Sequence, residues 1–151
     1  MPNFKFLNTS DLTDGEIYLQ LLRLLPDDEY KYYVPTYIFA ITKVDTNEIV
    51  GELALRIGFN RSLYYAGHIG YHVHKEFQGN NYAEKACRIA FRQARKHDME
   101  ELAITCNPDN IASRRTCEKL GGHLEEIVDV PPDTEVYEMG DRQKCIFMYE
   151  L

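Results

Sequence analysis

The sequence lacks the marks of a secreted, membrane or redox protein. Its four cysteines are scattered and include no C-x-x-C pair, so a disulfide framework is not expected. No apolar run is long enough to cross a bilayer, and the first residues lack the basic and apolar regions of a signal peptide. We therefore expect a cytoplasmic protein that stays out of membranes and keeps its cysteines reduced and buried.

Positive charge is scarce as well. The chain has 17 lysines and arginines against 24 aspartates and glutamates, which gives a formal charge of −7 and a pI near 5.2. An acidic surface repels phosphate backbones, so a nucleic-acid partner is not expected. One locally basic pocket remains compatible with this charge.

The composition is that of a globular protein. Hydrophobic residues make up 44% of the 151 residues and charged residues 27%, without an internal repeat, a low-complexity tract or a Gly/Ser linker. A chain of this length can bury a continuous core without staples. We expect one domain over residues 1–151, as a monomer or a homodimer.

The spacing of apolar residues predicts alternating strands and helices. The clearest element is a helix over Asn81–His97, where small apolar side chains recur at i, i+3, i+4 and i+7. Strands are expected over Asn3–Leu7, Tyr37–Val44, Glu48–Ile57, Ala66–His74, Glu101–Cys106, His123–Val130 and Lys144–Leu151. Further helices are expected over Gly15–Leu25 and Ile111–Leu120, with irregular segments over Tyr30–Thr36, Gly58–Tyr65 and Pro131–Gly140, the last long enough for a functional flap.

These elements predict an α/β fold. Strand–helix–strand units in the middle of the chain favour locally parallel pairing, and hairpins favour antiparallel edges. The expected architecture is a central mixed, mostly antiparallel sheet of about six to seven strands with helices on both faces.

The loop before the long helix has the chemistry of an anion site. It joins a strand to a helix N-terminus, where unpaired N–H groups and the positive dipole end favour phosphate. Gly79 allows close backbone approach, and Asn80 and Asn81 tolerate left-handed geometry. No P-loop Lys-Ser/Thr pair follows, which disfavours a nucleotide-binding NTPase. The alternative is an ordinary strand-to-helix connection capped by Gln and Asn.

A second segment adds a polar stripe. Asn110, Ser113, Cys117 and Leu120 share one face of the following helix by their three- and four-residue spacing. Amide and hydroxyl groups on a stripe that ends in leucine suit a ligand with amides on an apolar chain, such as pantetheine. The alternative is that Asn110 caps the helix and Ser113 bonds its own backbone.

Together the two segments resemble the GNAT N-acetyltransferases. The family's Gln/Arg-x-x-Gly-x-Gly/Ala signature corresponds to Gln78–Ala83, with Asn81 in place of a glycine, and asparagine is the best non-glycine residue for positive φ. The second signature, Asn-x-x-Ser/Ala followed by Glu-Lys-x-Gly, corresponds to Asn110, Ser113 and Glu118–Gly121. Order and spacing agree from about Tyr37 to the C-terminus, so the resemblance implies a GNAT-like fold.

The resemblance also implies a co-substrate and the residues that hold it. Acetyl-CoA would insert between the strand that contains Tyr71 and the strand Glu101–Cys106, which splay apart in this family. The strand would bind it through its backbone, the loop would hold the pyrophosphate, and an N–H near Val73 would polarise the thioester carbonyl. The implied co-substrate residues are Tyr71, His72, Val73, Gln78, Gly79, Asn80, Asn81, Tyr82, Ala83, Asn110 and Ser113.

The proton-transfer groups stay open at this point. Many family members carry a tyrosine that acts as the acid at the position of Cys117. Here Cys117 itself could be the acid, or Cys117 could be a packing residue while Ser113 or water assists. A third option is that Cys117 forms an acyl-cysteine intermediate. His72 and His68 are candidate bases, and Glu52 could act through water. No metal is expected, because the His72/His74 pair is only a two-ligand signal. Tyr30, Tyr32, Tyr33 and Tyr37 either line an acceptor pocket or pack.

The predicted function is acetyl transfer from acetyl-CoA to a primary amine of a small molecule or a peptide, by direct attack of the amine on the thioester. The alternative of a different class is a GNAT-fold acyl-CoA-binding module without turnover. The absent tyrosine and the substituted glycine are the features that favour that alternative.

Overall fold

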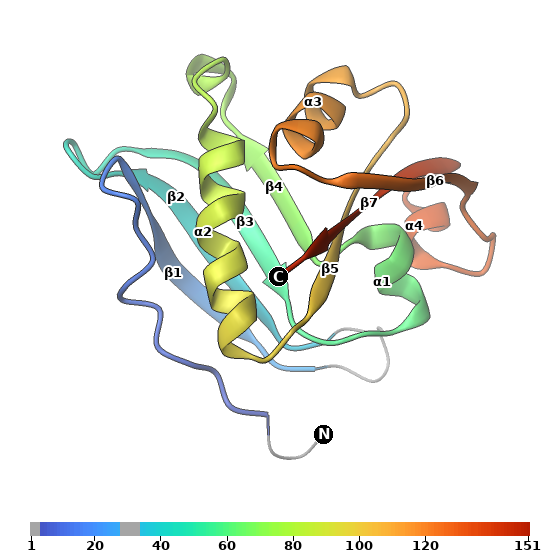
Figure 1. The fold of residues 1–151 in the computed structure, drawn as a ribbon, viewed down its shortest axis with the longest axis horizontal. Helices are drawn as coiled ribbons and strands as arrows, with labels where there is room; N and C mark the ends of the chain where they lie inside the picture. The colour runs from blue at the N-terminus through green and yellow to red at the C-terminus, as the bar shows by residue number, and fades with distance from the viewer. Residues whose placement is uncertain (1–3, 28–33) are drawn as a thin grey trace.

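Seven strands and four helices make up the part of the chain that the computed structural model describes, residues 4–27 and 34–151 (Figure 1). The strands form two sheets, a four-stranded one in the order β1-β2-β3-β4 and a three-stranded one in the order β5-β7-β6. The strands are β1 (Ile17–Leu25), β2 (Thr36–Lys43), β3 (Ile49–Arg56), β4 (Ile69–Val73), β5 (Glu101–Cys106), β6 (His123–Asp129) and β7 (Gln143–Glu150). The helices are α1 (Arg61–Ala66), α2 (Tyr82–Lys96), α3 (Ile111–Lys119) and α4 (Glu135–Glu138), with a 3₁₀ turn at Lys75–Phe77.

The predicted α/β class is confirmed, but the strand pairing differs from the expected one. Each of the ladders among the described residues is antiparallel, so the parallel pairing predicted for the middle of the chain does not form there. The reason is that β4 and β5 end up in different sheets. The strand–helix–strand unit is present, but its two strands part instead of pairing.

The first predicted helix is wrong. Residues 17–25 form β1, which pairs along its length with β2. Ile17 and Leu19 face the core, whereas Leu21, Leu22 and Leu24 are 37–45% exposed. Leucines on both sides of an edge strand can have the same spacing as leucines on one face of a helix. The hydrogen bonds that β2 offers along its free edge favour the strand. The other predicted helices and strands from Tyr37 onward are confirmed within a few residues at their ends.

The N-terminal segment is not the strand that its sequence predicts. Residues 4–9 run beside α2 without a ladder, and polar side chains of the helix bind the backbone of this segment and of Thr13. Arg92 donates to Thr13 O, Lys96 to Asn8 O, and Gln93 to Leu7 O. Phe6 packs edge-on against Tyr37, whose hydroxyl accepts from Leu7 N–H. Tyr37 is therefore a core residue, and the other three tyrosines of its cluster lie outside the described residues.

Helix α2 covers the four-stranded sheet through small side chains. Ala86, Cys87, Ala90 and Ala94 are fully buried, and the helix contacts β1, β3 and β4. In Figure 1 it lies across the face of this sheet. A stripe of alanines lets the helix axis approach the sheet closely, which brings the N-terminus of α2 next to the end of β4.

The two sheets meet at His68, just before β4. Its backbone N–H donates to Ala103 O at 2.7 Å, and its Nδ1 accepts from Ala103 N–H at 3.0 Å. Its Nε2 donates to Gly58 O at 2.8 Å. Beyond this point β4 and β5 diverge, so His68 fixes the closed end of the splay. Both ring nitrogens are engaged and the side chain is 2% exposed, which makes His68 a structural residue and not a base.

Two segments expected as loops contain short helices. α1 begins within the expected loop 58–65 and ends one residue beyond it, at Ala66, and α4 lies within 131–140. Asn60 and Thr134 cap their first turns. Neither 131–140 nor α4 lines a cavity described below. None of the described helices combines the length and apolar character that a bilayer crossing requires. Within residues 4–27 and 34–151 no three His, Cys, Asp or Glu side chains gather as a metal site would require.

Candidate active site

The loop from Gln78 to Ala83 has the left-handed geometry that its residues predict. Gly79 has φ +90° and Asn81 has φ +61°. Asn81 occupies the N-cap position of α2, yet its side chain makes no capping hydrogen bond there. It instead accepts from Lys119 Nζ at 2.9 Å. The first-turn N–H groups of α2 therefore start without a side-chain cap, beside a lysine, which is an arrangement that suits an anion.

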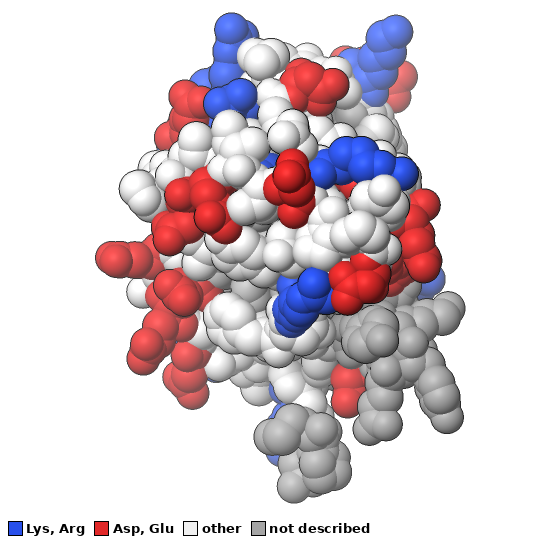
Figure 2. Space-filling view, turned by 90° about the vertical axis from the view of Figure 1, so that its right-hand side faces the viewer, with Lys and Arg blue, Asp and Glu red and all other residues white. Residues whose placement is uncertain are grey.

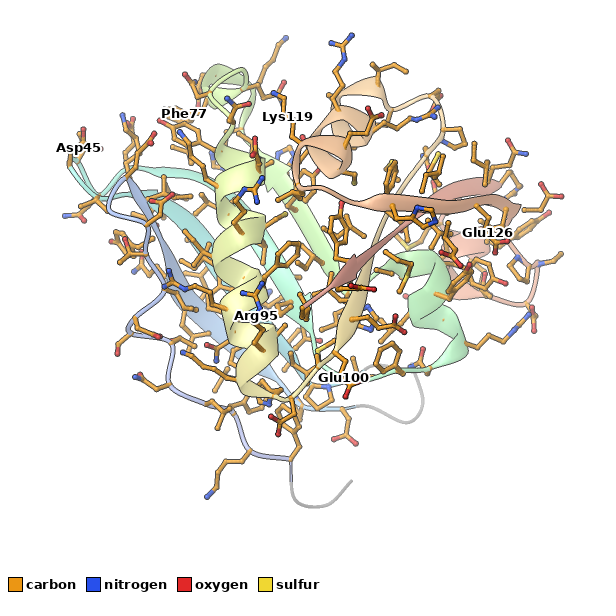
Figure 3. The ribbon with its side chains drawn as sticks, in the orientation of Figure 1. Asp45, Phe77, Arg95, Glu100, Lys119 and Glu126 are labelled. Atoms are coloured by element: carbon orange, nitrogen blue, oxygen red, sulfur yellow. The ribbon has the colours of Figure 1, made fainter. Side chains whose placement is uncertain are left out.

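Helix α3 presents its polar stripe next to this loop. Asn110 caps α3, because its Oδ1 accepts from Ser113 N–H at 3.1 Å, as the alternative reading of this residue expects. The Ser113 hydroxyl does not bond its own backbone in this way; it accepts from Tyr71 of β4 at 3.3 Å. At the other end, Gly121 takes φ +85° and ends the helix. In Figure 3, Lys119 of α3 lies toward the loop that carries Phe77.

A first cavity of about 450 Å³ lies between the end of β4, the start of α2 and α3. Ten of the eleven residues proposed from the two motifs line it; the exception is Asn80, which is exposed and donates from Nδ2 to Phe77 O. The wall also contains residues that the motifs did not identify, namely Phe77, Ala112, Arg115, Thr116 and Lys119. Arg115 and Lys119 give it two cations, and no aspartate or glutamate among the described residues lines it.

A second cavity of about 230 Å³ follows in the splay between β4 and β5. Tyr71, Asn110 and Ser113 line both cavities, so the two share one wall. The remaining lining residues come from several parts of the chain, namely Arg56, Ala66, Ile69, Gly70, Thr105, Cys106, Asn107 and Lys144. The arrangement offers a long site for an extended ligand and a smaller site at its far end.

Tyr71 stands at the junction of the cavities. It was predicted to act through its backbone, but its side chain also faces the site and bonds Ser113. Burial raises the pKa of Tyr71 to about 12, because an apolar environment disfavours the phenolate. The phenol therefore keeps its proton at neutral pH. Its position on the strand, one residue before His72, gave no signal of this role in the sequence.

The two remaining candidate bases, Glu52 and His72, lie on the face of the sheet opposite to the Tyr71 side chain. Glu52 and His72 are directly paired across β3 and β4, and both are exposed. Successive side chains of a strand alternate between faces, so the His72 ring points away from the face of Tyr71 even though the residue lines the first cavity. Glu52 lines neither cavity. The structure thus brings Glu52 and His72 together but not to the junction.

Cys117 is buried in the core and lines neither cavity. A hydrogen bond from the Cys106 thiol lowers the pKa of Cys117, and the same bond raises the pKa of Cys106. The Cys117 carbonyl accepts from the Tyr149 hydroxyl at 2.9 Å. Lack of contact with either cavity favours the packing role for Cys117 over the acid or nucleophile role.

The comparisons with known proteins identify the family. A family model for the acetyltransferase (GNAT) domain matches residues 8–123. The chain therefore belongs to the GNAT acetyltransferase family, and the resemblance inferred from the two motifs is confirmed. A search of curated proteins finds no significant match.

Solved structures share the fold at low identity. A GNAT-family acetyltransferase from Bacillus anthracis has 18% identity and a TM-score of 0.60 over 75% of this chain and 65% of that one. The ribosomal L7/L12 α-N-protein acetyltransferase RimL has 21% identity and a TM-score of 0.57 over 76% of this chain and 69% of RimL. The microcin self-immunity acetyltransferase MccE, in complex with acetyl-CoA and AMP, has 20% identity and a TM-score of 0.59 over 77% and 61%. The chain thus matches 61–69% of these relatives' own lengths.

Proposed function

We propose that this chain is an acetyl-CoA-dependent N-acetyltransferase that moves the acetyl group to a primary amine by direct attack. The observation that carries the proposal is the pair of adjoining cavities with Tyr71 at their junction. The first has the length, amide partners and cations that suit a coenzyme. The second is where an amine would meet the thioester. MccE is a relative whose structure holds acetyl-CoA, which supports the same co-substrate here.

The first cavity would hold the co-substrate in two parts. The pyrophosphate would lie on the N–H groups at the start of α2, with Lys119 and Arg115 nearby as cations. The pantetheine arm would run along β4 toward the second cavity, with backbone groups of residues 71–73 and the side chains of Asn110 and Ser113 as hydrogen-bond partners. The free edge of β4 suits this role because β5 does not pair with it.

Tyr71 is the proposed acid. Expulsion of the coenzyme thiolate requires a proton, and a phenol with a pKa raised to about 12 carries one throughout the neutral range. The hydroxyl hydrogen rotates about its C–O bond, so it can leave Ser113 and point to the thiolate. Tyr71 would thus replace the tyrosine that many family members carry at the position of Cys117, from a strand instead of a helix.

No carboxylate among the described residues is placed in either cavity to accept the proton of the amine. Neither cavity is lined by aspartate or glutamate of the described residues, and Arg56 and Lys144 in the second cavity disfavour the ammonium form of a bound amine. We therefore propose that the amine loses its proton to water before attack. His72 and Glu52 would act only through a chain of waters around β4.

Turnover separates this proposal from an acyl-CoA-binding module. Thiol release from acetyl-CoA would be followed across amino acids, polyamines, aminoglycosides and peptides, with the acetylated product identified by mass. We expect amine-dependent thiol release that the Tyr71→Phe variant loses. Binding of acetyl-CoA without thiol release across the whole panel would favour the binding module. RimL is a relative named for α-N-protein acetylation, so peptides with free N-termini belong in the panel.

A further inference from the structure

The second cavity differs in charge from the surface around it. The chain carries 24 acidic residues, and Figure 2 shows acidic side chains spread over the side that carries α1, α4 and β6 in Figure 1. The cavity wall, by contrast, contains Arg56 and Lys144, and no aspartate or glutamate of the described residues lines it. A cationic wall inside an acidic protein favours a ligand that carries an anionic group.

Lys144 is fixed by a carboxylate that does not itself line the cavity. Its Nζ lies 3.1 Å from Asp141 Oδ2, and its side chain is 13% exposed. The other oxygen of that carboxylate, Oδ1, accepts from Asn107 Nδ2 at 3.1 Å. Asp141 therefore orients both a cation and an amide of the cavity wall. Since an ammonium group has three donors, Lys144 can contact Asp141 and an anionic ligand at the same time.

Asn107 supplies the complementary group. Because a carboxylate only accepts, the contact with Asp141 determines that Nδ2 faces it and that Oδ1 lies at the other end of the amide. Asn107 Oδ1 is buried and has no hydrogen-bond partner among the described residues. A buried oxygen without a donor is costly. Because Asn107 lines the second cavity, an amine ligand held there is a source of the missing N–H donor.

Arg56 adds a second cation from β3. Its Nη1 donates to Gly67 O at 2.9 Å, and its guanidinium lies 3.5–3.9 Å from the point where a side chain at Gly70 would begin. A side chain at Gly70 would thus begin in ordinary contact with the guanidinium, which lies beside β4 in the cavity wall. Cations and an amide oxygen in one small cavity match a molecule with an anion and an amine only a few bonds apart.

We propose that the acceptor is an amine that carries a carboxylate or a phosphate close to its nitrogen. Lys144 and Arg56 bind the anionic group, Asn107 Oδ1 accepts from the amine, and Tyr71 marks the side from which the thioester arrives. This rests on the proposed function, and it assigns the acceptor class within it. Amino acids with a free α-carboxylate satisfy the description, whereas polyamines and neutral amines do not.

Binding measurements without turnover test the proposed acceptor class directly. Each L-amino acid and its α-carboxamide would be titrated by calorimetry into the protein saturated with CoA, which cannot donate an acetyl group. The two ligands differ in the carboxylate and keep the amine. We expect at least one amino acid to bind about tenfold more tightly than its amide. Amides that bind as tightly as acids across the series would overturn the proposal, even if the protein transfers acetyl groups.

Two substitutions separate the anion contact from the amine contact. Lys144→Gln should weaken amino-acid binding about tenfold and leave the amides within twofold, and Lys144→Arg should restore it in part. Asn107→Leu should weaken acids and amides alike. Lys43→Gln, at a half-buried lysine paired with Glu48 and outside both cavities, is the matched control and should change nothing. Equal loss of acids and amides in Lys144→Gln, with the thermal midpoint unchanged, would contradict the assignment.

Turnover assays with different acceptors identify which kind of molecule carries the anionic group. With acetyl-CoA, free amino acids, aminoalkyl phosphates and peptides that begin with aspartate or glutamate should all exceed their neutral counterparts in kcat/KM if the shared chemistry is right, and the best arm names the source. Preference for spermidine or for peptides with neutral ends would overturn the acceptor class. Absence of thiol release with every amine would contradict the proposed function alone, because the calorimetric comparison stands without it.

Discussion

The two cavities are built in different ways from the same chain. The first is made of two short stretches, the loop 77–83 and one side of α3, together with the last residues of β4. The second takes one to three residues from each of several segments, including Arg56 of β3, Thr105 of β5 and Lys144 of β7. A site made of contiguous segments keeps its geometry when the surrounding surface changes. A site made of scattered single residues changes its preference with one substitution, which suits a constant co-substrate beside a variable acceptor.

A substitution of Tyr71, at the junction between the cavities, should have the largest effect on activity. Tyr71→Phe should lower kcat by about 100-fold, because the leaving thiolate loses its proton donor, while the Kd for acetyl-CoA stays within twofold. Steady-state kinetics and calorimetry on the same preparations measure the two quantities. Tyr18→Phe removes a hydroxyl that bonds Asn47 on the surface and serves as the control. An unchanged kcat in Tyr71→Phe would remove Tyr71 from the chemistry.

A substitution in the first cavity should act on binding alone. Lys119→Ala should raise the Kd for acetyl-CoA about tenfold, because it removes a charge-assisted contact to phosphate, and kcat at saturation should stay within about twofold. Kd should also become less sensitive to salt. Lys96→Ala, at a lysine paired with Asp11 away from both cavities, provides the comparison. A Kd that does not move would place the phosphates elsewhere.

The left-handed residue before α2 should respond to backbone preference. Asn81→Val should lower the free energy of unfolding by about 1–2 kcal/mol, since a β-branched residue is strained at φ +61°. Asn81→Gly accepts the same φ without strain and should stay within about 0.5 kcal/mol of the native chain. Urea unfolding of both variants measures the difference. Similar stability of the two would mean that the loop does not keep this conformation in solution.

His68, at the point where β4 and β5 are joined, should give the smallest effect, which is a pH dependence of the free energy of unfolding. Burial lowers the pKa of His68, so the folded chain holds it neutral while the unfolded chain protonates it near its usual value. The free energy of unfolding should therefore be constant above about pH 6.5 and fall as the pH drops below it. His97, whose pKa is also lowered by burial, contributes in the same direction.

A variant isolates the contribution of His68. His68→Gln keeps a polar side chain between Gly58 and Ala103 but cannot titrate. Its free energy of unfolding should be lower than that of the native chain at pH 7.5 and should decline less between pH 7 and 5. Urea titrations at fixed pH values test this. A parallel decline in both proteins would assign the acid sensitivity to other groups.

The sequence named ten residues that line the first cavity, but of those that line the second it named only Tyr71, Asn110 and Ser113, which the two cavities share, although the resemblance implied the gap between the strands. Gly79 and Asn81 predict a loop with left-handed residues, and Asn110 predicts a helix start, because each residue type has a local conformational preference. Lys144, Asn107 and Arg56 carry no such signal. They become neighbours only when β4 and β5 separate. The family resemblance implied that separation, but no local residue preference shows which side chains meet in the gap.

The errors in the predicted fold have the same origin. Ile17, Leu21, Leu24 and Leu25 fit one face of a helix when the chain is read alone, and only pairing with β2 makes β1 a strand. The expected parallel pairing failed because His68 joins the strands at one point and the ladder does not continue. In each case an interaction between distant segments outweighed a local pattern.

The claim that the first cavity holds the coenzyme is tested most directly by calorimetry of the native chain with acetyl-CoA, CoA and ATP. Acetyl-CoA and CoA share the pantetheine arm that Ser113 and the edge of β4 would bind, whereas ATP offers phosphates without it. The account predicts that both coenzymes bind with a single site per chain and that ATP binds much more weakly. Binding of ATP without binding of CoA would contradict it.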